Sequence, residues 1–76
     1  MSKLPQLITT KNCPKCKLIK EYIAQKDFAY EVIEAEKNMK LCRNLGIMIA
    51  PTMLVYYQDR IEQFIGFEAI QKFIDK

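Results

Sequence analysis

The sequence predicts an α/β fold in which a four-stranded mixed sheet carries helices on both faces. Short apolar runs rich in β-branched and aromatic residues alternate with segments of helical spacing, in the order β-α-β-α-β-β-α. A helix between the first two strands favours a parallel pair with a right-handed crossover. The last two strands follow each other directly, which predicts an antiparallel hairpin at one edge of the sheet.

The first half of the chain predicts a strand, a helix and a second strand. Gln6–Thr10 is a short β-type run, and Pro5 before it suits the start of a strand. The first helix begins at Pro14, because proline is favoured at the first helical position, and Cys13 then lies at the cap. Phe28–Glu34 is predicted as the second strand. The apolar face of the first helix is assigned to Leu18, Ile19, Tyr22 and Ile23.

The second half predicts a helix, a hairpin and a closing helix. Residues 35–46 form a helix with Met39, Cys42 and Leu45 on one face and Gly46 as its terminator. Since Pro51 cannot lie inside a central strand, the third strand is predicted over Thr52–Tyr57. A turn at residues 58–60 leads into a fourth strand over Arg60–Ile65, which ends at Gly66. The last helix covers 67–76, with an apolar face made of Phe67, Ile70, Phe73 and Ile74.

Size and charge restrict the classes of function. The 76 residues, half of them apolar, predict one domain over residues 1–76 and a monomer. The net charge of +3 is spread among interspersed acids and bases, so neither a nucleic-acid nor a membrane partner is expected. The first residues lack the pattern of a signal peptide, so a cytoplasmic location is expected, where thiols stay reduced.

The segment around Cys13 and Cys16 carries the candidate chemistry. A disulfide between them closes too short a loop to stabilise the fold much, so a purely structural clip is disfavoured. Four lysines, at positions 11, 15, 17 and 20, flank the cysteines and are expected to create a local positive field. At a helix N-terminus, with Lys11 and Lys15 nearby, Cys13 is favoured as a thiolate and hence as the nucleophile. Cys16, one turn further on, is placed to resolve a mixed disulfide. A Cys-x-x-Cys motif within a βαβ pattern is typical of thioredoxin-like redox sites.

A metal or iron–sulfur module is the alternative of a different class. Zinc usually takes four Cys or His ligands, and this chain has no histidine and three cysteines. A metal would therefore need Cys42, a carboxylate or a second chain. Cys42 falls on the apolar face of its helix, where a free cysteine commonly acts as a small core residue.

Three motifs resemble those of the glutaredoxins and small thioredoxins: "NCPKC" after the first strand, "IAPT" before the third, and "IGF" after the fourth. The resemblance spans the whole chain and implies a thioredoxin fold in its minimal form. It implies a cis bond between Ala50 and Pro51, facing the cysteine pair. It also implies a substrate-binding edge whose residues are Ala50, Pro51, Thr52, Gly66 and Phe67, with Pro14 and the nearby lysines supporting the cysteines.

Departures from the family patterns bear on the electron donor. Asn12 stands where thioredoxins carry tryptophan, Lys15 where glutaredoxins often carry an aromatic residue, and Phe67 where glutaredoxins tend to have a second glycine. The chain is similar to glutaredoxin-like electron donors of ribonucleotide reductase. This implies a protein-disulfide reductant without a cofactor, reloaded by a thioredoxin-reductase-type flavoprotein, with ribonucleotide reductase among the candidate targets. A glutathione-dependent glutaredoxin is the alternative within the fold.

Overall fold

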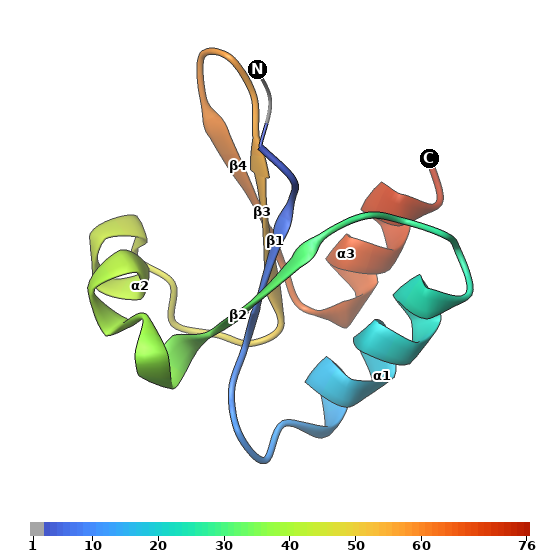
Figure 1. Cartoon of the computed structure of the whole chain (residues 1–76), viewed down its shortest axis with the longest axis horizontal. Helices are drawn as coiled ribbons and strands as arrows, with labels where there is room; N and C mark the ends of the chain where they lie inside the picture. Colours follow the sequence, from blue (N-terminus) through green and yellow to red (C-terminus); the bar gives the residue numbers. More distant parts are fainter. Residues whose placement is uncertain (1–2) are drawn as a thin grey trace.

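The computed structural model describes residues 3–76, which form one sheet of order β2-β1-β3-β4 with helices on both faces (Figure 1). The predicted α/β class and the mixed sheet are confirmed. The element bounds, in chain order, are β1 Gln6–Thr9, α1 Pro14–Ala24, β2 Glu31–Glu34, the 3₁₀ helix η1 Ala35–Lys37, α2 Met39–Leu45, β3 Thr52–Tyr56, β4 Ile61–Ile65 and α3 Phe67–Ile74.

Strand β1 lies inside the sheet and sets its register. Leu7 is opposite Val32 in the parallel pair with β2 and opposite Met53 in the antiparallel pair with β3. The hairpin partner β4 extends the sheet beyond β3, with Thr52 opposite Ile65. All four residues of β1 are buried, as expected for a strand paired at both edges and covered on both faces.

Alternate residues of the inner strands point into two separate cores. Leu7 and Met53 pack with Ile19 and Ile23 of α1 and Ile70 of α3. On the opposite face, Ile8 and Leu54 pack with Cys42 of α2. Figure 1 shows the resulting layers, with α1 and α3 together on one side of the sheet and α2 on the other.

Several predicted boundaries need correction. Strand β2 begins at Glu31 rather than Phe28, because its pairing starts only where β1 starts: the Glu31 N–H donates to the Pro5 carbonyl at 2.9 Å. The predicted helix over residues 35–46 is divided at Asn38, whose backbone (φ −136°, ψ 44°) is not helical. Gly46 does end α2 in the left-handed conformation, with φ 68°.

Two residues assigned to apolar helix faces are exposed, so those assignments were wrong. Leu18 is 54% exposed and Met39 is 62% exposed. The buried stripe of α1 instead follows Cys16, Ile19 and Ile23, and Leu18 lies one residue, or about 100°, away from it. On its face of the sheet, α2 contributes Cys42 and Leu45 to the core.

Within residues 3–76, no helix is long and apolar enough to cross a membrane.

The contrast between neighbouring positions on α1 gives a stability prediction. Replacing the fully buried Ile19 with alanine is expected to lower the free energy of unfolding by about 2–5 kcal/mol, because it removes core contacts and leaves a cavity. Leu18→Ala, on the exposed side of the same helix, serves as the matched control and is expected to change it by less than about 0.5 kcal/mol. Urea unfolding followed by circular dichroism measures both; equal losses would contradict the assigned core.

Candidate active site

A tight loop between β1 and α1 places Cys13 at the start of the helix. Asn12 adopts a positive φ of 57°, a conformation that asparagine tolerates better than most residues. Cys13 then has extended backbone (φ −114°, ψ 96°) and is the N-cap of α1. Pro14 follows in the first helical turn, where its missing N–H costs no helical hydrogen bond.

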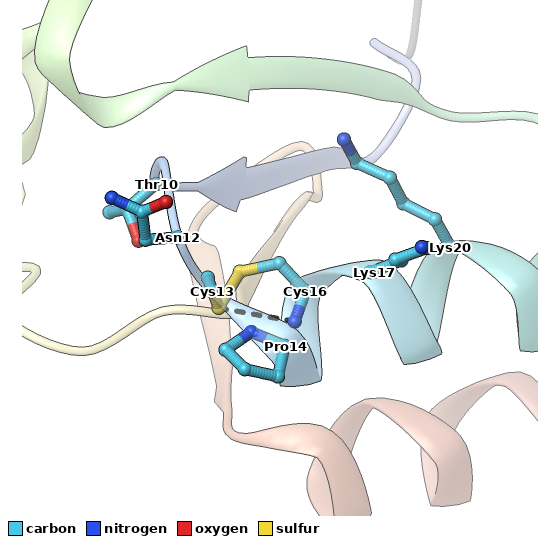
Figure 2. A pocket seen from close by; sticks show the side chains of 7 residues that line it. All are labelled: Thr10, Asn12, Cys13, Pro14, Cys16, Lys17 and Lys20. Carbon is cyan, nitrogen blue, oxygen red and sulfur yellow. Dashed lines mark hydrogen bonds between the residues drawn. A yellow bond between two sulfur atoms is a disulfide. The ribbon is translucent and has the colours of Figure 1, made fainter.

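Cys13 and Cys16 form a disulfide, with their Cα atoms 5.2 Å apart. The Cys13 Sγ accepts a hydrogen bond from the Cys16 backbone N–H at 3.1 Å, drawn as a dashed line in Figure 2. Cys16 is only 3% exposed, whereas Cys13 is half-buried. The pair is therefore asymmetric, because an incoming group can reach Cys13 but not Cys16.

The loop before β3 lies against Cys13. The Ala50–Pro51 peptide bond is cis, and the Ala50 carbonyl oxygen is 3.9 Å from the Cys13 Sγ. Regular pairing of β3 begins at Thr52, so the backbone of Ala50 lies outside the sheet ladder. The Pro51 carbonyl accepts a 2.8 Å hydrogen bond from the Gly66 N–H, which joins this loop to the turn before α3. Cys13, Ala50, Pro51 and Gly66 are thereby brought into one neighbourhood.

The two lysines predicted to support Cys13 have different surroundings. The backbone N–H of Lys11 donates to the Glu36 carboxylate at 2.9 Å, and this hydrogen bond lowers the pKa of Glu36. Lys15 lines a hollow of about 410 Å³ between α1 and α3, together with Gly66 and Phe67. That hollow also holds Glu68, so Lys15 faces a mixed-charge surface.

Of the four lysines that flank the cysteines in the sequence, Lys17 and Lys20 line the hollow that contains the disulfide. This hollow has a volume of about 660 Å³, and Figure 2 draws the side chains that line it. The spacing carried a usable signal: on a helix, Lys20 lies four residues after Cys16 and three after Lys17, so all three share one face.

Cys42, the third cysteine, lies in the core on the α2 side of the sheet. Its side chain is buried and packs with Ile8 and Leu54, as its place on the apolar helix face predicts. In the described part of the chain, no three Cys, Asp or Glu side chains are grouped so that they could hold a metal ion.

Comparisons with known proteins address the fold. No protein-family model and no curated protein matches the sequence. Among solved structures, oxidised thioredoxin from Plasmodium falciparum superposes with a TM-score of 0.74 at 15% identity, over 93% of this chain and 76% of that one.

The chain has the thioredoxin fold.

Two further structures agree. A thioredoxin-like protein, solved as a point mutant, gives a TM-score of 0.66 at 19% identity, over 90% of this chain and 95% of that one. A malarial protein gives a TM-score of 0.65 at 14% identity, over 93% of this chain and 91% of that one. The three superpositions agree on the fold, and within it a Cys-x-x-Cys disulfide lies at the N-terminus of α1.

Gly66 gives a prediction about the turn beside the site. Its backbone (φ 92°, ψ 165°) lies in a region that is essentially restricted to glycine. A Cβ at this position would meet no atom within 4 Å, so the cost of Gly66→Ala is backbone strain rather than a clash. We expect a loss of about 1–3 kcal/mol in the free energy of unfolding. Thermal and urea unfolding measure this loss, and Ala69→Gly in α3 serves as the control for helix propensity. An unchanged stability of the Gly66→Ala variant would contradict the strained conformation.

Proposed function

We propose that this protein reduces disulfides in other proteins by thiol–disulfide exchange through Cys13 and Cys16. The observation that carries the proposal is the asymmetric disulfide, with an accessible Cys13 at the N-cap of α1 and a buried Cys16 one turn further on. Unpaired N–H groups and the positive end of the helix dipole favour a negative sulfur at that position. The hydrogen bond from the Cys16 N–H to Cys13 Sγ adds to this stabilisation.

The reaction begins from the dithiol form. The Cys13 thiolate attacks one sulfur of the target disulfide, forms a mixed disulfide and releases the other target sulfur as a thiolate. Cys16 then loses its proton and attacks the Cys13 sulfur, which frees the second target thiolate and forms the Cys13–Cys16 disulfide seen here. Two electrons pass to the target, and its two thiolates take up protons from the thiols and solvent.

A target segment binds along the loop before β3 in this proposal. The Ala50 backbone lies beside Cys13 and outside the sheet ladder, so an extended segment can pair with it as a short added strand. Pro51 and Thr52 fix that loop on the start of β3, while Gly66 and Phe67 form the neighbouring edge. Met48 and Ile49 of the same loop are 92% and 58% exposed, which suits contact with the apolar surface of a protein.

The electron donor in this proposal is a thioredoxin-reductase-type flavoprotein, which returns two electrons to the disulfide without a cofactor bound to this chain. Gly66 is followed by Phe67 rather than by the second glycine that glutaredoxins tend to have, and Glu68 offsets the charge of Lys15 in the hollow beside it. That arrangement favours a flavoprotein over glutathione as donor. Ribonucleotide reductase stays a candidate target, and the cytoplasm, where a reductant of this kind operates, stays the proposed location.

The two cysteines are expected to fail differently when replaced. Cys13→Ser should reduce the turnover of a protein disulfide, such as insulin, to the background rate of the reductant alone, because no nucleophile remains. Cys16→Ser should still attack once and accumulate as a mixed disulfide, which non-reducing mass spectrometry detects. Cys42→Ser is the matched control and should retain activity, since the Cys42 side chain is buried with Ile8 and Leu54 in the core on the α2 side of the sheet. Substantial activity in Cys13→Ser would show that the nucleophile is wrongly assigned.

Two purified reducing systems test the donor. We expect NADPH with thioredoxin reductase to reduce the Cys13–Cys16 disulfide rapidly, and NADPH with glutathione reductase and glutathione to reduce it at least about tenfold more slowly. NADPH oxidation at equal protein concentrations measures both rates. The reverse ranking would identify a glutaredoxin and reject the proposed donor, while leaving the exchange chemistry intact.

A further inference from the structure

The lining of the hollow beside the disulfide contains basic side chains and no acidic one. Its lining contains two charged side chains, Lys17 and Lys20, both from α1. The remaining lining residues are polar, apolar or part of the disulfide: Thr10, Asn12, Cys13, Pro14 and Cys16. Figure 2 shows Lys17 and Lys20 along the helix after Cys16, with Thr10 and Asn12 on the loop before Cys13.

Two acidic groups close to this hollow, Glu34 and Glu36, already have other partners. Glu36 accepts the backbone N–H of Lys11, and Glu34 is 3.5 Å from the Lys37 ammonium. Both line an adjoining hollow that Lys20 shares. In the described chain, the ion pairs within 4 Å involve neither Lys17 nor Lys20. Their ammonium groups are therefore available to a group that enters beside the cysteines.

The charge is distributed unequally around Cys13. On the side toward α3, Lys15 shares its hollow with Glu68, so the two charges compensate. On the side of Lys17 and Lys20, the lining of the hollow that contains the disulfide has no carboxylate, and the carboxylates of Glu34 and Glu36 belong to the adjoining hollow that Lys20 also borders. A binding partner placed across Cys13 therefore meets a cationic surface on one side only.

We infer that the hollow lined by Lys17 and Lys20 receives an acidic segment of the partner protein, next to the disulfide that Cys13 attacks. This inference rests on the proposed function and adds the chemical class of its substrate. Carboxylates adjacent to the target cysteine pair with the two ammonium groups, which steers the target disulfide toward Cys13 and selects acidic over basic segments. The lysines act on binding, and the exchange chemistry stays with the cysteines.

Three disulfide-bonded peptides of otherwise identical sequence provide the test. Their residues beside the attacked cysteine are glutamate, glutamine or lysine, and each carries a quenched fluorophore that is released on reduction. The reduced protein is mixed with each peptide, and the second-order rate constant is measured at ionic strengths of about 0.01 M and 1 M, where charges are screened beyond about 30 Å and 3 Å. We expect the glutamate peptide to react roughly three- to tenfold faster than the glutamine peptide at low salt, and the lysine peptide to react more slowly than both. The differences should largely vanish at high salt.

Variants assign the effect to this hollow. The double variant Lys17→Gln/Lys20→Gln should bring the glutamate-to-glutamine rate ratio close to one at low salt. Lys40→Gln removes the same kind of charge from α2, on the opposite face of the sheet, and should keep the parental ratio. The glutamate-to-glutamine rate ratio separates two possible roles of the lysines. If the lysines acted only on the cysteine sulfurs, their replacement would slow the reaction of all three peptides by the same factor and leave the ratio unchanged.

Three outcomes decide the inference. A parental glutamate-to-glutamine ratio near one would overturn it, and so would a ratio that the double variant leaves unchanged. If the ratio falls to the same extent in Lys40→Gln, net charge rather than this hollow is responsible, and the inference is likewise wrong. Failure of the protein to reduce any of the three peptides, including the neutral one, would instead overturn the proposed function on which the inference depends.

Discussion

The pairing of β1 on both edges is the constraint on which the rest of the structure depends. This strand is buried over its whole length, with β2 hydrogen-bonded on one side and β3 on the other. Its alternate residues Leu7 and Ile8 belong to the two different cores, so a slip of one residue would exchange the faces that α1 and α2 cover. The strand therefore fixes where the following loop begins, and with it the position of Cys13.

Two loops from distant parts of the chain meet where β1 ends. The loop before α1 presents Cys13, and the loop before β3 presents Ala50, whose carbonyl oxygen lies 3.9 Å from the Cys13 sulfur. A third segment, the turn at Gly66, is tied to Pro51 by a backbone hydrogen bond of 2.8 Å. The site thus depends on backbone contacts between three connections, while the buried strands hold those connections at fixed positions.

The sequence predicts much of this arrangement because its signals are local. Pro14 marks the helix start, Pro51 excludes an earlier start for β3, and Gly46 marks a helix end, and each acts through its own backbone preferences. The errors have a different origin. Phe28 and Tyr30 have strand-forming side chains but precede the paired part of β2, and pairing depends on where β1 lies. The exposure of Leu18 depends on how α1 is rotated against the sheet. The apolar residues of α1 form two overlapping stripes, so their periodicity does not determine that rotation.

The residues of the site also fall into those that local sequence signals identify and those that depend on tertiary structure. Cys13 and Cys16 are three positions apart in sequence, so their motif identifies them, and the nearness of Lys20 follows from helical spacing. The pairing of the Lys11 N–H with Glu36 joins residues 25 apart and has no local signal. Lys15 lies next to Glu68, whereas Lys17 and Lys20 line a different hollow. This difference can be predicted only when the position of α3 beside α1 is known.

The depth at which each sulfur lies has a practical consequence for isolating bound partners. Cys42 is 9% exposed and is enclosed by the second core, and Cys16 is 3% exposed. A protein in which serine replaces Cys16 therefore offers one reachable thiol, that of Cys13, to its surroundings. When immobilised, this variant would hold each captured protein through one mixed disulfide at Cys13. A mild thiol wash would then release the captured proteins without disturbing the fold.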